Sequence, residues 1–319
     1  MPHEVETMAY AGEVPWHGLG TKVKGLMTVH EALAAAGLDW EVELANIFIE
    51  TKGVGVGLVE QWKAVRRLTD RKVFGIVGAK YEPIQNKDAF KFFDEVVGSG
   101  QAIYETAGAL QEGRRIWILA NMKGSIGIRG DEVKKYITLT NSHDGTLALQ
   151  MFWTPIRVVC MNTLRMALSG ARESFYCRHT LNAPERIAAA REILGLANKF
   201  YEEWKAQARH LAVLALPAPK IPLLLKAAFD YPEDKPMGEI YDPMRVQMDK
   251  AKELIYTGRG QDNPKIQGTA WQAYNGIVEY ADYYRPYRSE APDARLRGAW
   301  FGTGMDIKKR AWEYLTNLK

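Results

Sequence analysis

The chain has few cysteines, no long apolar run and no P-loop, and each lack excludes a class of protein. Two cysteines among 319 residues are too few for the disulfide framework of a small secreted domain. No apolar segment approaches the roughly 20 residues that a membrane-spanning helix needs. The pattern Gly-x-x-x-x-Gly-Lys-Ser/Thr does not occur in the sequence, which argues against an ATP-driven motor or strand-exchange ATPase.

Recognisable metal and dinucleotide motifs are also scarce. The six histidines are scattered, and no pair has the spacing of a zinc finger or zinc helix. The glycines alternating with valine at residues 53–57 precede no phosphate-binding helix, so we expect a mobile hairpin tip or loop there. We interpret Ser142-His143-Asp144 as a hairpin turn, because a catalytic triad is assembled in space rather than along the sequence. We therefore expect no cofactor.

The charge of the chain is unevenly distributed. The net charge is +4, but residues 1–60 carry 3 Lys and Arg against 9 Asp and Glu, and residues 61–181 carry 18 against 11. Residues 182–319 carry 21 against 18. The acidic N-terminal part and the basic middle permit a polyanionic partner for the middle segment. The N-terminus has no basic segment followed by an apolar one, so we expect a cytoplasmic protein without membrane attachment.

Apolar periodicity and turn residues predict an α+β protein, with an antiparallel sheet that has helices packed on one face and a mostly helical C-terminal part. We expect a core domain over residues 1–181 and a helical region over residues 182–319. Strands are expected at residues 39–50, with a bulge near 45–46, and at 61–68, 72–79, 101–110, 114–122, 134–141 and 146–153. Helices are expected at residues 29–36, 87–97, 154–168, 183–214, 243–256, 269–284 and 306–318.

The predicted helix over residues 154–168 is the first candidate for binding an anion. Thr154 suits an N-cap and Pro155 suits the first helical position. Arg157, Arg165 and Arg172 fall on the face opposite an apolar one. Such a helix seats its apolar face on a sheet and presents its basic face to an anionic partner, of which nucleic acid is the obvious one. The alternative is a solvated helix face.

Basic residues also occur beside aromatic residues on the predicted middle strands. Trp62 flanks the basic residues of segment 61–80, Trp117 follows Arg114 and Arg115, and Tyr136 follows Lys134 and Lys135. This pairing suits a groove that follows a phosphate backbone while bases stack on the rings. Alternatively the rings point into the core and the charges into solvent. The residues expected to contact nucleic acid are Lys63, Arg66, Arg67, Lys72, Lys80, Arg114, Arg115, Lys134, Lys135, Arg157 and Arg165.

Two further features leave alternatives open. Glu41 and Glu43 share one strand face, and with Lys63 they suit a nuclease that binds Mg²⁺; alternating Glu on a half-solvated strand is the other interpretation. The C-terminal aromatic residues suit either a subunit contact or helix packing within one chain. They are Trp271, Tyr274, Tyr280, Tyr283, Tyr284, Trp300 and Phe301.

The chain resembles a family of phage- and plasmid-borne proteins of unknown function. The segments that carry the resemblance span nearly the whole chain, and they are Met8-Ala9-Tyr10, Pro15-Trp16-His17-Gly18-Leu19-Gly20, Ala36-Gly37-Leu38-Asp39-Trp40, Arg157-Val158-Val159-Cys160-Met161-Asn162-Thr163-Leu164 and Trp300-Phe301-Gly302. The resemblance implies a mobile-element protein that works in a bacterial cytoplasm. It does not itself imply an activity.

The order of the predicted elements is similar to that of phage single-strand annealing proteins of the RecT, Redβ and Erf type. This second resemblance rests on element order and charge. It implies an oligomeric ring or filament that binds single-stranded DNA and anneals complementary strands without ATP. Our leading hypothesis is therefore an accessory protein of phage or plasmid recombination or replication. The alternatives are a metal-dependent nuclease and a protein-binding module, such as an inhibitor of a host defence system.

Overall fold

The computed structural model of the chain describes residues 5–11, 21–23, 29–97, 102–157, 162–163, 174–180, 193–286, 298 and 302–318. The chain forms two compact units, each assembled from three segments. Unit 1 comprises Met1–Lys123, Ile137–Phe152 and Ser174–Leu196, and unit 2 comprises Gly124–Tyr136, Trp153–Glu173 and Ala197–Lys319. The expected domain boundary at residues 181–182 lies outside the described residues and stays a prediction.

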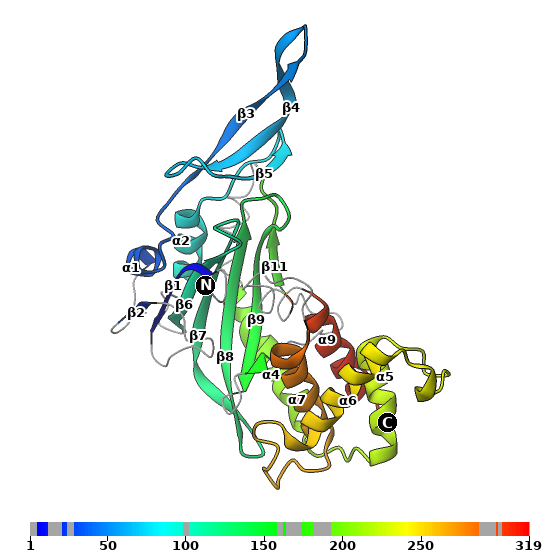
Figure 1. Cartoon of the computed structure of the whole chain (residues 1–319). Coiled ribbons are helices and arrows are strands. Elements are labelled where there is room, and N and C mark those ends of the chain that lie inside the picture. Colours follow the sequence, from blue (N-terminus) through cyan, green and yellow to red (C-terminus); the bar gives the residue numbers. More distant parts are fainter. Residues whose placement is uncertain are drawn as a thin grey trace. The chain divides into compact units, whose positions relative to one another are not determined.

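The larger of two sheets has eight strands in the order β10-β9-β8-β7-β6-β1-β2, with β11 pairing with β9 (Figure 1). Strand β6 pairs antiparallel with β1 and β7, and β9 pairs antiparallel with β10 and β11, whereas β1 and β2 are parallel. Strands β7, β8 and β9 contribute residues to both units. The strands are β1 (Val5–Ala11), β2 (Thr21–Val23), β6 (Ala102–Leu110), β7 (Arg115–Ile128), β8 (Asp131–Ser142), β9 (Leu149–Arg157), β10 (Asn162–Thr163) and β11 (Ser174–Cys177).

The smaller sheet belongs to unit 1 and consists of β3 (Val42–Thr51), β4 (Gly55–Arg67) and β5 (Val73–Gly78) in that order. Both of its pairs are antiparallel. The register of β3 against β4 shifts between Asn46 and Ile47, which confirms the bulge expected there. The hairpin tip predicted at residues 53–57 is confirmed in part, because the turn between β3 and β4 occupies residues 52–54, whereas residues 55–57 begin strand β4.

Tight turns join the long strands where the sequence has turn residues. The β6–β7 turn has positive φ angles at Gln111, Glu112 and Gly113, as the predicted turn requires. The β7–β8 turn is a two-residue connection in which Arg129 and Gly130 both have positive φ, the conformation that suits the twist of a hairpin. This turn lets β7 and β8 run several residues further than the sequence predicts, to Ile128 and from Asp131.

The prediction of a helix over residues 154–168 is wrong for the residues of this segment that the structure describes. Strand β9 continues through Thr154 to Arg157, and β10 follows at Asn162–Thr163. Pro155 fits the strand because β11 pairs with Leu149–Phe152 and β10 pairs with Ile156 and Arg157, so its missing N–H falls between the two partner strands. Residues 158–161 and 164–168 lie outside the described part.

Helices α1 and α2 belong to unit 1, where both contact β6 and α1 also contacts β1. Asn86 opens α2 as expected, but its side chain donates to the carbonyl oxygens of Leu38 and Trp40 instead of capping the helix. The later helices belong to the mostly helical C-terminal part. The helices are α1 (Val29–Ala35), α2 (Asn86–Val97), α4 (Ile193–Leu211), α5 (Ile221–Phe229), α6 (Asp242–Thr257), α7 (Ala270–Glu279) and α9 (Thr303–Thr316), with short turns η2 (Ala218–Lys220), η3 (Met237–Glu239) and η4 (Tyr280–Tyr284).

The core of unit 2 is built from aromatic side chains. The ring of Trp204 on α4 stacks on that of Trp312 on α9, with centroids 6.2 Å apart, and meets Trp271 on α7 edge-on at 6.0 Å. Tyr274 packs edge-on against Trp312 at 4.9 Å. For Trp271, Tyr274 and Tyr280, packing within one chain is therefore the correct interpretation, because all three are buried. Trp300 and Phe301 lie outside the described residues.

The structure confirms the α+β class, with antiparallel pairing in both sheets and a mostly helical C-terminal part. Helix α4 is bound to strand β8 within unit 2, because the hydroxyl of Tyr201 donates to the carbonyl oxygen of Tyr136 at 2.6 Å and accepts its N–H at 2.8 Å. Among the described residues, no helix combines the length and the apolar character needed to cross a membrane.

Candidate nucleic-acid interface

Arg67, on β4, is held inside unit 1. Its guanidinium donates to both carboxylate oxygens of Asp70, at 3.0 and 2.6 Å. The same group lies over the rings of Trp40 and Phe74, 5.2 and 5.5 Å from their centroids. The hydrogen bond from Arg67 holds the pKa of the Asp70 carboxyl well below its ordinary value. Arg67 thus stabilises the β4–β5 turn, and its side chain is only 8% exposed.

Lys63 and Arg66 are surface residues of β4 with partners on β3. The Lys63 ammonium donates to Asn46 Oδ1 at 2.6 Å, and Arg66 Nε donates to Glu43 Oε1 at 2.7 Å. Both bonds follow the strand register, in which Asn46 lies opposite Lys63 and Glu43 opposite Arg66. The two cations keep part of their surface in solvent, so their charge remains accessible to a phosphate.

Three turns of unit 1 meet at one end, which we call the three-turn end: residues 68–72, 111–114 and 143–147. Lys72 Nζ and Glu112 Oε2 are 2.5 Å apart and join the first turn to the second. The N–H of His143 donates to the carbonyl oxygen of Arg114 at 2.7 Å, and Arg115 donates to Thr146 Oγ1 at 3.3 Å. The fold therefore gathers cations that lie far apart in the sequence.

The three-turn end and the adjoining strands carry more cations than acids. Arg71, Lys80 and Arg114 are exposed. The acids of this region are Glu41, Glu43, Glu60, Asp70, Glu82, Glu112 and Asp144. The cations are Lys63, Arg66, Arg67, Arg71, Lys72, Lys80, Arg114 and Arg115. The positive excess is therefore small, and Arg66, Arg67 and Lys72 are paired with acids.

One aromatic ring beside these cations is available to a ligand. Trp62, on β4, is 51% exposed and lies opposite Gly78, two residues before Lys80. Trp117 and Tyr136 are buried, so for these two rings the core interpretation is correct and stacking with bases is excluded. The alternation of side chains along a strand could not show that Trp62 is exposed while Trp117 and Tyr136 are buried. Burial depends on which face of the strand is covered by another layer of the protein.

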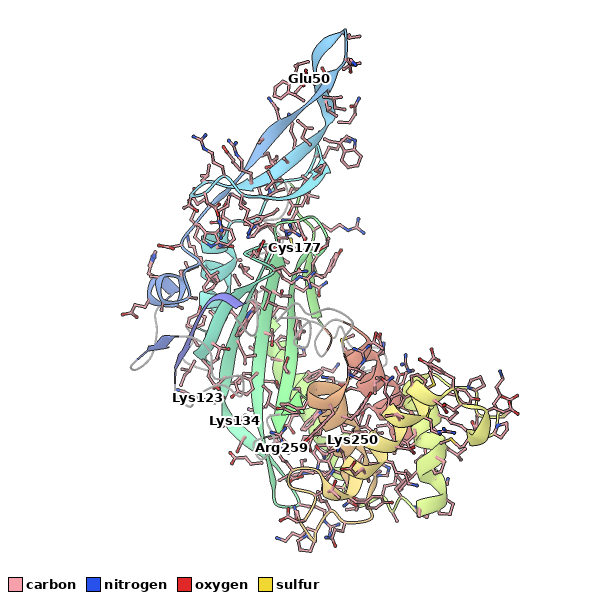
Figure 2. All side chains as sticks on the ribbon, viewed as in Figure 1. Glu50, Lys123, Lys134, Cys177, Lys250 and Arg259 are labelled. Carbon is pink, nitrogen blue, oxygen red and sulfur yellow. The ribbon has the colours of Figure 1, made fainter. Side chains whose placement is uncertain are left out.

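The remaining predicted cations are not in this group. Lys134, labelled in Figure 2, and Lys135 lie on β8 in unit 2. The ammonium of Lys135 lies 6.0 Å from the ring centroid of Tyr201. Arg157 is the last residue of β9 and also belongs to unit 2. Arg165 lies outside the described residues. Arg157 and Arg165 were expected on one basic helix, but the chain is a strand at Arg157.

The carboxylates of the nuclease hypothesis are bound to separate cations. Glu41 accepts a hydrogen bond from Lys87, and Glu43 accepts one from Arg66. Lys63, the lysine of the nuclease hypothesis, donates to Asn46. In the part of the chain that the structure describes, no group of three or more His, Cys, Asp or Glu side chains is arranged to hold a metal ion.

Two buried histidines underlie the three-turn end, and sequence reasoning did not find them. His143 Nε2 is 2.8 Å from Asn86 Oδ1, and His179 Nδ1 accepts the N–H of Ile84 at 3.3 Å. The ring of His179 stacks on Tyr81 at 4.8 Å. Burial lowers the pKa of His143 to about 3 and that of His179 to about 4. Both rings are therefore neutral at pH 7 and add no positive charge to the interface.

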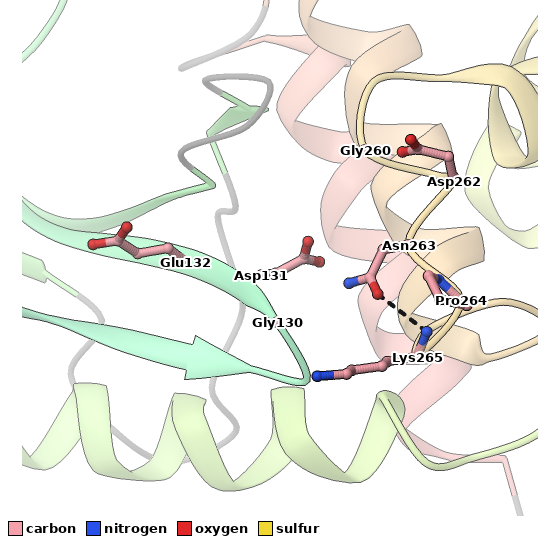
Figure 3. Close-up of a pocket in the computed structure, with 8 residues that line it drawn as sticks. All are labelled: Gly130, Asp131, Glu132, Gly260, Asp262, Asn263, Pro264 and Lys265. Carbon is pink, nitrogen blue, oxygen red and sulfur yellow. Dashed lines mark hydrogen bonds between the residues drawn. The ribbon is translucent and has the colours of Figure 1, made fainter.

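A cavity of about 470 Å³ in unit 2 lies between the β7–β8 turn and the loop before α7 (Figure 3). Carboxylates from Asp131, Glu132 and Asp262 line it, against a single cation, Lys265. Asp131 accepts the indole N–H of Trp271 at 2.8 Å, and Asn263 donates to the carbonyl oxygen of Arg129 at 3.1 Å. The excess of carboxylates makes this cavity unsuited to phosphate.

The distal part of the β3–β4 hairpin exposes apolar side chains. We call residues 47–61 the β-arm; it extends past the end of β5, and Figure 2 labels Glu50 on it. Its exposed large apolar residues range from Leu58, at 48%, to Val54, at 84%. The sequence signal for this surface was the alternation of glycine and valine at residues 53–57, which predicted the turn but not the exposed faces.

The fold and the cation group define an α+β protein with a basic end in unit 1. A family model described as a domain of unknown function, DUF932, matches residues 73–300. The match covers more than half of the chain, so the protein belongs to this family. No curated protein and no solved structure matches the chain.

Proposed function

We propose that the protein is an accessory protein of phage or plasmid recombination or replication that binds and anneals single-stranded DNA without ATP and works as an oligomer. The observation that carries the proposal is the convergence of Lys72, Arg114 and Arg115 on the three-turn end. Phosphates along a single strand bind such a group mainly through charge, and binding releases counterions.

The exposed ring of Trp62 supplies the second element of single-strand recognition. It lies beside Lys63 in sequence and next to the β5 end that leads to Lys80. Stacking of a base on an aromatic ring contributes roughly 1–3 kcal/mol and tolerates any sequence. A strand held extended by its backbone, with bases accessible on one side, is ready to pair with a complementary strand.

Fluorescence anisotropy of a labelled single strand of about 40 nucleotides, at several salt concentrations and without metal, tests the proposal. We expect tight binding with a steep salt dependence. In the variant Lys80→Ala/Arg114→Ala, the slope of log K against log salt falls by about 0.7 for each phosphate that the protein no longer neutralises. Trp62→Ala weakens binding by about 1–3 kcal/mol at every salt concentration. Mixing complementary strands with the protein then measures annealing.

The matched control is Lys252→Ala/Lys309→Ala, which removes two exposed cations of unit 2. This control keeps the net charge equal to that of the test variant, so only the position of the charge differs. Absence of binding by the unmodified protein at low salt rejects the proposal. Equal losses in the two double variants reject the three-turn end as the interface.

A protein-binding module is the second candidate, and the exposed apolar side chains of the β-arm favour it. Contiguous apolar surface of this kind is typical of contacts with proteins. The anisotropy experiment separates the candidates, because a protein-binding module without nucleic-acid affinity leaves the labelled strand free at low salt.

A further inference from the structure

The segment that connects β5 to α2, residues 79–85, is bound to both sheets of unit 1, and we call it the β5–α2 linker. Toward the large sheet, the Tyr81 hydroxyl donates to the carbonyl oxygen of Ser142, at the end of β8, at 3.3 Å. Toward the small sheet, the Gln85 side chain donates to the carbonyl oxygen of Val42 at 2.9 Å and accepts the N–H of the same residue at 3.0 Å. The linker therefore joins the small sheet to the large one.

Strand β5 lies directly on the turn that begins at His143. A Cβ on Gly75 of β5 would meet the carbonyl oxygen of Asp144 at 2.6 Å, and a Cβ on Gly145 would meet Cγ1 of Val77, also on β5, at 2.9 Å. A glycine inside a strand often marks the close approach of another backbone. The position of the small sheet therefore depends on this turn of the large sheet.

Two buried histidines hold the linker and the start of α2 with neutral rings. His179 Nδ1 accepts the N–H of Ile84 at 3.3 Å, so Nδ1 carries no proton and Nε2 carries one. His143 Nε2 lies 2.8 Å from Oδ1 of Asn86, the first residue of α2. The amide nitrogen of Asn86 donates elsewhere, so its oxygen accepts the Nε2 proton and His143 Nδ1 carries none. Within the described residues, the buried atoms His143 Nδ1 and His179 Nε2 have no hydrogen-bond partner.

Protonation of either ring disrupts this arrangement. A second proton on His179 lies on Nδ1 and faces the N–H of Ile84, so an acceptor becomes a donor and the hydrogen bond is lost. A second proton on His143 lies on Nδ1, and a buried donor without an acceptor is costly. Burial is accordingly the main cause of the low pKa of both rings. A protonated ring is stable only when the linker opens to water.

The charges around the two rings do not compensate for this burial. Asp144 favours the charged form of both rings, but burial outweighs it. Arg67 adds a positive charge near His143, because its guanidinium lies over the ring of Trp40, which meets His143 edge-on at 5.2 Å. A charge on His179 also disfavours one on His143. The charged and titratable side chains of the segments that pack against the rings, or adjoin them in the sequence, are Arg67, Tyr81, Glu82, Arg114, Asp144, Cys177 and Arg178.

We propose that His143 and His179 form an acid-sensitive clasp, which holds the small sheet on the large sheet of unit 1 while both rings are neutral and releases the linker when they are protonated. The turn at residues 68–72 belongs to the small sheet, and those at 111–114 and 143–147 belong to the large sheet. Release therefore separates the turns of the three-turn end and weakens DNA binding, a consequence that rests on the proposed function. The test of the clasp contains no DNA, so its failure and the failure of DNA binding are distinguished.

Hydrogen exchange of the full chain at about pH 7.5 and about pH 5.5, measured by mass spectrometry and corrected for the intrinsic effect of pH on amide exchange, tests the clasp. In the open linker each ring regains its ordinary pKa of about 6.5. We therefore expect the protection of the linker to fall about tenfold between the two pH values for each histidine that opening releases. At the lower pH the linker exchanges faster than residues 117–120 in the middle of β7, because opening does not unfold the large sheet.

Two substitutions keep the hydrogen bonds of the clasp and remove its titration. His179→Asn offers an amide oxygen in place of Nδ1, and His143→Gln offers an amide N–H in place of Nε2. The double variant His143→Gln/His179→Asn therefore loses the difference in protection between the two pH values. His143→Ala/His179→Ala lacks the clasp, and its linker exchanges at least about tenfold faster than that of the unmodified protein at the higher pH.

The matched control is His30→Gln/His210→Gln, which changes two histidines at exposed positions of α1 and α4 and keeps the pH-dependent loss of protection. Far-ultraviolet circular dichroism measures whether each variant is folded. A loss of protection that persists in full in His143→Gln/His179→Asn overturns the proposal. It is also overturned by an unmodified protein whose linker, at the lower pH, exchanges as slowly as residues 117–120.

Discussion

Unit 1 and unit 2 differ in what their large apolar side chains do. In unit 2, Trp204, Trp271 and Trp312 are fully buried between helices. In unit 1, Phe48 and Val56 are mostly exposed on the β-arm. A helix has one apolar stripe that a neighbouring helix covers, whereas a two-stranded arm has two faces and needs a layer on at least one of them. The apolar stripes of the unit 2 helices are therefore covered within the chain at these tryptophans, whereas the apolar side chains of the β-arm stay exposed.

The family match sharpens this contrast. It begins at residue 73, the first residue of β5, and runs to residue 300. Strands β3 and β4, and with them the β-arm and Trp62, precede the matched region. The Lys72–Glu112 ion pair joins the last residue before the match to the β6–β7 turn within it. The β-arm and Trp62 thus precede the matched region, whereas two turns of the three-turn end, with Arg114, lie within it.

The largest effect is expected from the buried ion pair of unit 2. Lys308 Nζ lies 2.8 Å from Asp282 Oδ1, and both side chains are almost inaccessible to solvent. Lys308→Met leaves the carboxylate of Asp282 buried without its cation, which costs about 3–5 kcal/mol. Urea unfolding followed by tryptophan fluorescence measures the loss, because Trp204, Trp271 and Trp312 report on the same unit. Lys309→Met, at an exposed neighbouring position, changes the free energy of unfolding little; equal effects of the two variants contradict this account.

A smaller loss of stability is expected from Arg67 than from Lys308, and it distinguishes Arg67 from its neighbour Arg66. From the sequence, both arginines were predicted to contact nucleic acid. Arg67→Ala removes two hydrogen bonds to Asp70 and the contacts with Trp40 and Phe74, and we expect it to cost about 2–3 kcal/mol of unfolding free energy. Arg66→Ala removes a half-exposed pair with Glu43 and costs about 0–1 kcal/mol. Chemical denaturation of the two variants side by side measures the difference. Equal stabilities would show that Arg67 is not the structural residue that its contacts indicate.

The smallest effect is the pH dependence of unit 1. Burial places the folded-state pKa of His143 at about 3 and that of His179 at about 4, below the ordinary value of about 6.5. The unfolded chain therefore binds more protons than the folded chain as the pH falls. The contribution of the two neutral histidines to the free energy of unfolding is fully present above about pH 6.5 and is lost as the pH falls toward 4 and 3. Between about pH 7.5 and 5.5, each histidine lowers the free energy of unfolding by about 1 kcal/mol. Denaturant titrations at the two pH values measure this.

The variant His143→Gln tests the source of that pH dependence. It removes one titrating group, so the difference in stability between the two pH values becomes smaller. The matched control is His210→Gln, which changes a histidine at an exposed position of α4 in unit 2. A pH difference that His143→Gln does not reduce would assign the effect to other groups.

The sequence by itself determined the local elements of this protein. Alternation along residues 39–50 predicted a strand with a bulge, which the structure forms as β3, and the turn residues at 111–113 and 143–145 predicted two connections of the large sheet. Apolar periodicity predicted helices over residues 87–97, 269–284 and 306–318, and the structure has α2, α7 and α9 at 86–97, 270–279 and 303–316. These features depend on residues that are close in the chain, and the same local signals yielded the α+β class.

Only the tertiary structure decided which side chains became interior and which became surface. Thr154 and Pro155 have the residue types of a helix start, yet they extend β9, because neighbouring strands pair with this segment on both sides of Pro155. Trp62 and Trp117 both lie on strands, but only Trp117 is covered. Burial depends on whether a distant element lies over a given face. That contact is formed by residues far apart in the chain, so no local pattern records it.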